Sequence, residues 1–490
     1  SVPIFANIST TNLNFEIKNS AMKYMFIDSQ ERLKDIEKEN SHLTFITHNF
    51  CIKEPNFYNF DEILVIGKQI CDATGFTSFE ANPNDIFSII YTSGNTGTPK
   101  GVMLSHKNIV SQLHDINKLI DLPKGEIALS LLPLAHIFER TVMSYYLSRG
   151  ISIYFVDDVL NVANLMKIVK PTIMTVVPRL LEKIFNKIKA QILEKPFFSR
   201  VIASLAFSYA LKENLDKSSI LFKIYDKLVY SKFREIFGSR VDKLVSGGAP
   251  LSKDIAQFFV NIGVPVYQGY GMTEFSPVIS TNYPNANKVG SCGKVIPSAQ
   301  IKINENNELL VRGDSLMLGY LNQEELTKNT IDSDGWLHTG DVAYLDEDGY
   351  LFIKSRIKDI FKTSTGEYVN AVEIEQKLSK NRYIEFAVVI SQNRKYTTAL
   401  LFVDKEKYEN AKKLNKNLTI EEYYNKDDIL KNISNHINSV NSGLNKWEKI
   451  VKFKILTNDI SIETGELTPS MKISRSKIEE KYANIINSMY

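Results

Sequence analysis

The chain has 490 residues, of which 43% are hydrophobic and 23% charged, and its formal net charge is +3. These proportions are ordinary for a soluble globular protein, and the length predicts roughly three domains, or one large and one small domain. The lysine-rich segments alternate with acidic and apolar residues, which is typical of solvated helix faces rather than of a nucleic-acid-binding arm. We therefore expect no nucleic acid as a partner.

The cysteines and the hydropathy pattern bear on the cellular compartment. Cys51, Cys71 and Cys292 are widely spaced and odd in number, so they fit neither a disulfide framework nor a metal cluster. No apolar run is as long as a membrane span, and no signal-peptide pattern occurs at the start. A reducing compartment, with the cytoplasm as the default, is the expected location.

The first predicted elements are the end of a strand, a second strand and a helix. The opening "SVPIFANIS" (1–9) reads as the end of a strand, so we expect further residues of the same domain upstream. An apolar, β-branched run over 86–91 predicts a strand. A helix should follow Ser105, a favourable N-cap, because Ile109, Leu113 and Ile116 fall on one helical face.

Between that strand and helix lies "YTSGNTGTPKG" (91–101), which has the composition of a P-loop. A Walker loop has Gly before its Lys and continues directly into a helix. Here Pro99 precedes Lys100 and keeps the chain out of a helix at that point. The glycines and hydroxyls still suit an anion. We interpret the segment as a phosphate loop of another kind; the alternative is a Gly/Ser/Thr turn between strand and helix.

The remaining chain shows three changes of pattern. Short apolar runs that begin near residues 128, 152, 173, 243 and 264 alternate with helical patterns, which predicts a parallel α/β sheet covered on both faces. Residues 180–237 read as helical throughout. After Pro297 come paired alternating strands with turns at 304–307 and 348–349. From about Ile357 we predict a smaller α+β region of about 130 residues, in the order helix, strand, strand, helix, strand, helix.

Several loops carry residues suited to chemistry at the carboxyl ends of strands, where ligands of α/β sheets gather. The glycines of "SGGAP" (246–250) would let a planar ring lie against the backbone. In "YQGYGMTE" (267–274), Tyr270 can stack and Glu274 is a hard oxygen ligand for Mg²⁺. In "LHTGD" (337–341), Asp341 could accept from both hydroxyls of a ribose. "KSRIKD" (354–359) lies at the boundary between the large and small regions, and "ELTPSMKISR" (466–475) contains Lys472. Taken singly, each has an ordinary explanation as a turn, a helix N-terminal residue or a surface charge.

Together and in this order, the motifs resemble the acyl-adenylate-forming superfamily of acyl-CoA synthetases, luciferases and nonribosomal adenylation domains. The resemblance runs nearly end to end. The segment "LPLAHIFERTVMSYYLSRGISIYF" (132–155), the helical region 180–237 and the tail containing "ELTPSMKISR" look like the long-chain fatty acyl-CoA synthetase branch.

The resemblance implies a reaction, its co-substrates and a fold. A fatty acid carboxylate is joined to the α-phosphorus of ATP with release of pyrophosphate, and the acyl group then passes from AMP to the thiol of coenzyme A, with Mg²⁺ as the metal. The implied fold is α/β. A large AMP-binding domain over 1–357 lacks its opening elements and carries a β-rich subdomain, and a small, mobile α+β lid domain covers 358–490.

The resemblance also implies roles for individual residues. Lys100 and its loop would hold the β- and γ-phosphates, and Glu274 would hold Mg²⁺. Lys472 would bridge the carboxylate and the α-phosphate as a point charge, with no proton to transfer. The implied nucleotide-binding residues are Thr92, Ser93, Gly94, Asn95, Thr96, Gly97, Lys100, Gly248, Ala249, Pro250, Tyr270, Gly271, Thr273, Asp341 and Arg356.

Three further residues are implied in acyl binding and in the second half-reaction. Lys358 would be the hinge about which the small domain rotates, and Gly366 would line the path of the pantetheine. His136 would lie beside the acyl site. An isolated histidine favours a structural role, whereas its place in "LPLAHIFE" favours the site.

The chain departs from the family pattern at several positions. Ser355 replaces the Gly before the ribose arginine, Met471 precedes the catalytic lysine, Asn95 stands where Thr is common, and Asn370-Ala371 replace a proline region. We expect these changes to tune activity rather than abolish it. Missing opening elements would expose an apolar edge and face of the sheet, and this could leave the polypeptide unstable or inactive.

Two other functions are compatible with these residues: a fatty acyl-AMP ligase that loads a carrier protein, and a non-catalytic fatty-acid-binding fragment. The presence of Lys100, Glu274, Asp341 and Lys472 argues against simple loss of function. A lipid substrate is compatible with peripheral membrane contact, but no amphipathic anchor stands out. Neither the acyl chain length nor the oligomeric state follows from the sequence.

Overall fold

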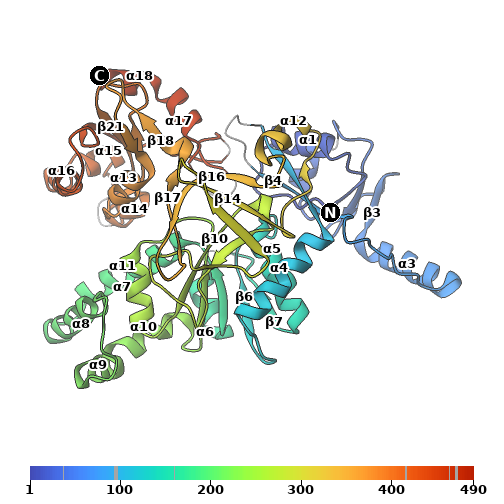
Figure 1. Cartoon of the computed structure of the whole chain (residues 1–490), viewed down its shortest axis with the longest axis horizontal. Helices are drawn as coiled ribbons and strands as arrows, with labels where there is room; N and C mark the ends of the chain where they lie inside the picture. The colour runs from blue at the N-terminus through green and yellow to red at the C-terminus, as the bar shows by residue number, and fades with distance from the viewer. Residues whose placement is uncertain (37, 93–97, 159–160, 414–415, 463, 469–472) are drawn as a thin grey trace. The chain divides into compact units, whose positions relative to one another are not determined.

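The computed structural model describes residues 1–36, 38–92, 98–158, 161–413, 416–462, 464–468 and 473–490 (Figure 1). The chain divides into two compact units. Unit 1 comprises Ser1–Lys302, Leu310–His338 and Tyr344–Phe352. Unit 2 comprises Ile303–Leu309, Thr339–Ala343 and Ile353–Tyr490.

A seven-stranded sheet of order β12-β11-β10-β9-β8-β6-β7 is the centre of unit 1. The five strands from β7 to β10 are parallel, as predicted, but β11 and β12 extend the sheet in antiparallel fashion. The sheet is therefore mixed, because a hairpin rather than a helix connects β10 to β11. Its strands are β6 (Ile127–Ser130), β7 (Ser152–Phe155), β8 (Ile173–Val176), β9 (Lys243–Ser246), β10 (Val266–Gly271), β11 (Val278–Thr281) and β12 (Lys294–Val295).

Helices cover both faces of this sheet, which confirms the predicted layering. Leu129, Met174 and Leu244 pack with α6, α7 and α11 on one face. The neighbouring strand residues Ala128 and Ile173 pack with α4 and α5 on the other, because successive side chains alternate between faces. The helices are α4 (His106–Leu119), α5 (Ile137–Arg149), α6 (Val162–Val169), α7 (Pro178–Leu193), α8 (Phe197–Ala210), α9 (Ile220–Tyr225), the π-helical η2 (Asp226–Tyr230), α10 (Ser231–Arg234), the 3₁₀ turn η3 (Glu235–Phe237) and α11 (Lys253–Asn261).

A separate three-stranded sheet of order β15-β5-β4 carries the predicted phosphate loop. Its members are β4 (Ile86–Thr92), β5 (Lys100–Ser105) and β15 (Gly319–Tyr320), and α12 (Glu324–Thr330) follows β15. The sequence predicted that a loop leads from the strand over 86–91 directly to the helix after Ser105. The strand β5, which lies between that loop and the helix, was missed. The helix α4 does begin after Ser105, whose hydroxyl accepts a hydrogen bond from Asn108 N–H at 3.2 Å.

The N-terminal segment forms a small parallel sheet of order β1-β2-β3 with three helices. The prediction of a strand at the opening is wrong. Ser1 does lie along the edge of β4, because its amino group donates to Phe87 O and its carbonyl accepts from Ile89 N–H, but Pro3 has no N–H to continue a ladder. None of the residues of α3 is buried. The elements are α1 (Thr10–Asn19), β1 (Tyr24–Ile27), α2 (Gln30–Ile36), β2 (Thr44–Thr47), β3 (Phe57–Asn59) and α3 (Phe60–Thr74).

The two hairpins predicted after Pro297 are present and form a four-stranded sheet of order β13-β14-β16-β17. Its strands are β13 (Ala299–Ile303), β14 (Glu308–Gly313), β16 (Leu337–Leu345) and β17 (Leu351–Arg356). The turn between β16 and β17 is the predicted one, and Gly349 there has φ +77°, which a glycine adopts without strain.

The C-terminal part of unit 2 has a three-stranded sheet of order β20-β21-β22 between two helical layers. Ala387, Val389 and Leu401 pack with α13 and α16, and Val388 and Leu400 pack with α17 and α18. The predicted element order is present, with a short β18–β19 hairpin that was missed because its strands have three residues each. The elements are η5 (Ile357–Asp359), β18 (Ile360–Lys362), β19 (Tyr368–Asn370), α13 (Ala371–Leu378), β20 (Ile384–Ile390), β21 (Thr397–Val403), α14 (Lys405–Lys412), α15 (Ile420–Tyr424), α16 (Asp427–Ser442), β22 (Ile450–Leu456), α17 (Arg475–Lys481) and α18 (Ala483–Ser488).

A membrane-crossing helix is not found among the described residues: each helix is too short or too polar for that role.

The buried Glu16 of α1 gives a test of this N-terminal packing. Burial raises the pKa of its carboxyl from 4.5 to about 8, so the folded chain holds a proton that the unfolded chain releases. The stabilisation from that proton is complete below pH 4.5 and is lost as pH rises through about 8. At pH 9, Glu16→Gln should therefore raise the free energy of unfolding by on the order of 2 kcal/mol or more, and the melting temperature by a few degrees, relative to wild type. At pH 4.5 the melting temperature should change little.

The control is Glu31→Gln, which changes an exposed carboxyl of α2. Its melting temperature should follow wild type at both pH values. An equal gain for Glu16→Gln at pH 4.5 and pH 9 would contradict a buried, protonated Glu16.

Candidate functional site

The β4–β5 hairpin places two of the predicted phosphate-binding residues side by side. Thr92 at the end of β4 is the register partner of Lys100 at the start of β5. Lys100 therefore begins a strand, which confirms that the chain does not enter a helix at Lys100. The other predicted members of the loop, Ser93, Gly94, Asn95, Thr96 and Gly97, lie outside the described residues.

Lys100 and Glu274, both predicted as catalytic, meet at the same side chain. The Tyr320 hydroxyl donates a hydrogen bond of 2.8 Å to Glu274 Oε1. The Lys100 Nζ atom lies 5.4 Å from the centroid of the Tyr320 ring, within the range of a cation–π interaction. Gly319 and Tyr320 pair with Met103 and Val102 of β5, so the pairing of β15 fixes this tyrosine beside the hairpin.

The surroundings of Tyr320 keep its hydroxyl protonated. Burial raises the pKa of Tyr320, and the charge of Glu274 and the hydrogen bond between the two groups raise it further. The hydroxyl can thus act only as a donor to the Glu274 carboxylate near neutral pH. Sequence reasoning missed Tyr320, because a two-residue strand shows no periodicity that would indicate it.

Glu274 belongs to a single 3₁₀ turn, η4 (Thr273–Phe275), directly after β10. A register irregularity against β11 lies between Tyr270 and Gly271. A Cβ atom at Gly271 would lie 1.9 Å from Pro277 O, so this close backbone approach requires glycine. The carbonyl of Glu274 accepts from Met317 N–H at 2.9 Å, which ties the turn to the segment before Tyr320.

The predicted adenine loop follows β9 and is open to solvent. Gly248, Ala249 and Pro250 are exposed, and Gly248 has φ +81°. The preceding Gly247 is in close contact with α5: a Cβ atom there would lie 3.2 Å from the Phe138 ring. A side chain at Gly247 would therefore require the Phe138 ring to shift by a few tenths of an ångström.

The segment "LPLAHIFE" forms the start of α5. His136 is the N-cap residue, and its Nδ1 accepts a hydrogen bond from Phe138 N–H at 3.2 Å. This bond requires an unprotonated Nδ1 and gives His136 the structural role that an isolated histidine favours; the site role stays a prediction.

Three residues further along α5, Glu139 is a buried acid that sequence reasoning missed. Its two carboxylate oxygens accept from the Ser130 and Thr175 hydroxyls, each at 2.5 Å. Burial raises the pKa of Glu139, and these two hydrogen bonds oppose the rise. Ser130 ends β6 and Thr175 lies in β8, so Glu139 ties α5 to the carboxyl ends of two central strands. An acid within the apolar run "IFERTVM" was the available signal.

In unit 2, the structure brings the two predicted ribose-binding residues together. Arg356 Nε donates to Asp341 Oδ1 at 3.2 Å. Asp341 is buried in β16, whereas the Arg356 side chain is 60% exposed, so the arginine covers the carboxylate from the solvent side. The Asp341 N–H donates to Thr339 Oγ1 at 3.1 Å, which holds the strand at the aspartate.

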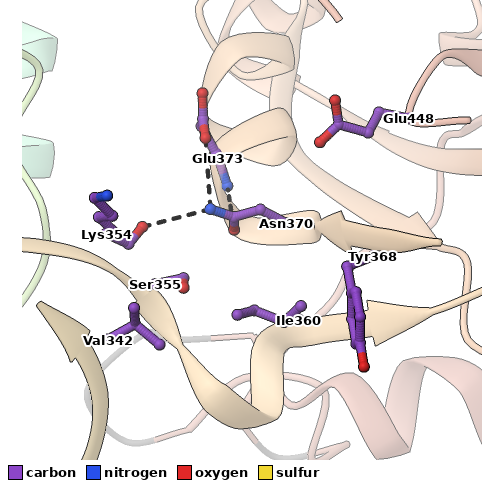
Figure 2. Close-up of a pocket in the computed structure, with 8 residues that line it drawn as sticks. All are labelled: Val342, Lys354, Ser355, Ile360, Tyr368, Asn370, Glu373 and Glu448. Atoms are coloured by element: carbon purple, nitrogen blue, oxygen red, sulfur yellow. Dashed lines mark hydrogen bonds between the residues drawn. The ribbon is translucent and has the colours of Figure 1, made fainter. Parts of the chain in front are cut away.

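A cavity of about 410 Å³ lies close to these residues in unit 2 (Figure 2). Figure 2 shows the Asn370 amide between the Lys354 carbonyl and the Glu373 carboxylate, which accept from it at 3.4 Å each. Two of the departures from the family pattern, Ser355 and Asn370, therefore line one cavity. The lining residues are Val342, Lys354, Ser355, Ile360, Tyr368, Asn370, Glu373 and Glu448.

The predicted hinge and the predicted coenzyme A residue occupy short exposed segments of unit 2. Lys358 lies in the 3₁₀ turn η5. Gly366 lies in the turn between β18 and β19 with φ +91°, and its N–H donates to Thr363 O at 3.0 Å. Neither segment has a long hydrogen-bonded element of its own.

Lys472 lies outside the described residues, but the segments on both sides of it are anchored. Leu467 and Ile473 form a β-bridge, and the buried Glu466 pairs with Lys481 of α17. Arg475 donates to Glu375 Oε1 at 2.6 Å and to Val389 O at 2.7 Å. The residues that flank the Lys472 segment are thus tied to each other, to α13 and α17, and to β20.

One carboxylate in unit 1 fits the implied Mg²⁺. Glu274 is half-buried and presents oxygen atoms, which Mg²⁺ prefers. Among the described residues there is no cluster of three or more His, Cys, Asp or Glu that could hold a metal. Mg²⁺ that arrives with a nucleotide needs only one or two protein carboxylates, since phosphate oxygens supply further ligands. The residues present therefore fit a nucleotide-bound Mg²⁺ rather than a resident one.

The Arg475–Glu375 pair provides a stability test of the anchor beside Lys472. Burial raises the pKa of Glu375 and the guanidinium of Arg475 lowers it, so loss of Arg475 leaves a buried carboxyl without its cation. Arg475→Met should lower the unfolding free energy of unit 2 by about 3 kcal/mol. The double variant Arg475→Met/Glu375→Gln should recover part of this loss in denaturant titrations. If the double variant is as unstable as the sum of both single variants, the pair does not stabilise the segment.

Comparisons with known proteins identify the family. A family model described as AMP-binding enzyme matches residues 1–321, and one described as AMP-binding enzyme C-terminal domain matches residues 358–490. The chain is 32% identical to the long-chain-fatty-acid–CoA ligase FadD15 of Mycobacterium tuberculosis, over 83% of this chain and 69% of the relative. It is also 32% identical to the long-chain-fatty-acid–CoA ligase ACSBG2 of Xenopus laevis, over 100% of this chain and 73% of the relative.

The solved structures agree in fold. One of them is the o-succinylbenzoate coenzyme A synthetase MenE of Bacillus subtilis, in complex with ATP and magnesium ion. It superposes with a TM-score of 0.66 at 20% identity, and the match covers 97% of this chain and 83% of the MenE chain. The predicted α/β fold class, with a large N-terminal and a smaller C-terminal domain, is confirmed. The chain belongs to the family of AMP-binding enzymes.

Proposed function

We propose that this chain is an AMP-forming long-chain fatty acyl-CoA ligase. The observation that carries the proposal is the convergence of Lys100 and Glu274 on Tyr320, which combines a cation for phosphate with a hard carboxylate for Mg²⁺ in a chain of this family. Relatives that match over most or all of the chain are named long-chain-fatty-acid–CoA ligases, which supports the substrate class.

In the first half-reaction, an oxygen of the fatty acid carboxylate attacks the α-phosphorus of ATP. The new bond is the acyl–phosphate bond of acyl-AMP, and the bond to pyrophosphate breaks. Lys100 and Thr92, with the loop between them, bind the departing phosphates. Lys472 offsets the repulsion between carboxylate and α-phosphate as they approach. Mg²⁺ held at Glu274 would neutralise phosphate charge.

In this proposal, the nucleoside is bound by two groups of residues. The exposed backbone at Gly248, Ala249 and Pro250, together with Tyr270 of β10, Gly271 and Thr273, binds the adenine side. Asp341 accepts from the ribose hydroxyls, and its observed hydrogen bond with Arg356 supports a shared role for the pair. His136 lies beside the acyl group.

In the second half-reaction, the coenzyme A sulfur attacks the acyl carbon, the bond to AMP breaks, and the thiol proton passes to solvent. Coenzyme A must reach an acyl-adenylate that Lys472 covers, so the small domain rotates about Lys358 and brings Gly366 to the pantetheine path. The match to the C-terminal domain model begins at residue 358, which supports domain limits of 1–357 and 358–490. The cytoplasm is the proposed location.

The test is pyrophosphate release from ATP, Mg²⁺ and fatty acids of graded length, with and without coenzyme A. We expect release with palmitate, acyl-CoA formation only when coenzyme A is present, and at least a 100-fold loss in Lys472→Ala. Pyrophosphate release with transfer only to a carrier protein would instead identify an acyl-AMP ligase. Palmitate binding without any pyrophosphate release would identify a fatty-acid-binding protein and overturn the proposal.

Tyr320 provides a second test, because its hydroxyl is hydrogen-bonded to Glu274. Tyr320→Phe removes the hydrogen bond but keeps the ring beside Lys100, and Tyr320→Ala removes both. A hydrogen bond to a charged group contributes about 1.5–3 kcal/mol, so Tyr320→Phe should lower kcat/KM for ATP about tenfold or more and raise the Mg²⁺ concentration for half-maximal activity. Tyr320→Ala should lower kcat/KM for ATP further than Tyr320→Phe does.

The control is Tyr154→Phe, at an exposed tyrosine of β7. It should leave both quantities unchanged. Unchanged Mg²⁺ dependence in Tyr320→Phe would show that the hydroxyl does not position Glu274.

A further inference from the structure

Helix α8 is apolar on two opposite faces. Ala203, Ala206, Phe207 and Ala210 follow a helical spacing of three and four residues and are buried in the core of unit 1. A second stripe with the same spacing is exposed, and the ring of Phe198 within it is 81% exposed. A surface helix of a globular protein normally has a polar outer face. The exposed stripe consists of Phe198, Val201, Ile202 and Leu205.

A neighbouring segment carries a similar stripe. Along α9 and η2, Ile220, Leu221, Ile224 and Leu228 are exposed, with Ile220 at 78%. This segment is held against α8 by the rings of Tyr209 and Tyr225, whose centroids are 5.5 Å apart, and by a 2.8 Å hydrogen bond from the Tyr230 hydroxyl to Ala206 O. Figure 1 shows α8 and α9 at the margin of unit 1, away from its strands. The eight residues of the two stripes are called the apolar patch below.

Basic residues lie before, between and within the two stripes along the sequence. Residues 195–232 contain seven Lys and Arg and three Asp and Glu, a net charge of +4, whereas the whole chain has +3. Lys195, Lys212, Lys223 and Lys227 are exposed. The helices that expose apolar side chains therefore lie in a segment of net positive charge.

We propose that the apolar patch and its surrounding lysines dock unit 1 on the surface of an anionic phospholipid bilayer. A helix that inserts apolar side chains at the headgroup boundary and keeps lysines near anionic lipids gains from both burial and charge. A second copy of the chain is a poorer occupant, because two such surfaces would bring like charges together. The inference goes beyond the proposed ligase activity, and vesicle binding can be measured without ATP, fatty acid or coenzyme A.

The experiment is cosedimentation of the full chain with vesicles of phosphatidylcholine alone and with about 30% phosphatidylglycerol, a composition that gives a negative surface potential. We expect binding to the anionic vesicles at least tenfold tighter than to the neutral ones, and weaker binding as salt is raised. Phe198→Ser/Leu205→Ser/Ile224→Ser should lower binding to anionic vesicles at least tenfold. Lys223→Glu/Lys227→Glu should also lower binding to anionic vesicles and should make that binding less dependent on salt.

The matched control is Val110→Ser/Leu147→Ser/Ile168→Ser, which removes three comparably exposed apolar side chains elsewhere in unit 1. It should bind vesicles as wild type does, and melting temperatures should show that all variants fold. The proposal is overturned if wild type does not bind anionic vesicles, if the patch variant binds as wild type, or if both triple variants lose binding equally. Self-association in sedimentation velocity that the patch variant abolishes, without vesicle binding, would assign the patch to a second copy.

Discussion

The hydrogen bond from Tyr320 to Glu274 is the interaction on which the candidate site of unit 1 depends. It joins the two-residue strand β15 to the 3₁₀ turn after β10, and the same tyrosine contacts Lys100 of the β4–β5 hairpin through its ring. Because burial and the nearby carboxylate raise the pKa of Tyr320, the hydroxyl stays a donor and holds Oε1 of the Glu274 carboxylate. A cation and an anion are thus held near one ring without a direct ion pair between them.

Backbone constraints place these groups before any ligand binds. Gly271 must be glycine because Pro277 O lies where its Cβ would be, and Gly247 packs closely against the Phe138 ring. The same ring belongs to α5, whose Glu139 is hydrogen-bonded to β6 and β8. The loops after β9 and β10 are therefore fixed to the central sheet by close packing, and their exposed atoms do not need to be ordered at the moment of binding.

Sequence reasoning found the elements and residues that have a local signal. The apolar runs of the central sheet, the Ser105 cap and the hairpin turns after Pro297 all depend on neighbours within a few residues, and each is present. Asp341 and Arg356 were each implied by resemblance in ribose binding, and the structure joins them by a hydrogen bond, which was not predicted. By contrast, three features depend on partners that are distant in the sequence. The strand β5 pairs with β4 across the loop, and Glu139 and Tyr320 have hydrogen-bond partners from 9 to 46 residues away. No local pattern indicates such partners.

Helix α8 shows why burial is the hardest property to infer from sequence. The helical pattern over 180–237 does not tell which face of a helix is buried, because periodicity reports which residues share a face but not what covers that face. In the structure only the alanine-rich face and Phe207 are covered, and small residues there let α8 lie close to the core while the larger side chains point outward. Large apolar residues outside and small ones inside reverse the usual arrangement of a surface helix, and with lysines on the neighbouring segment this favours an apolar, anionic environment outside the protein rather than water.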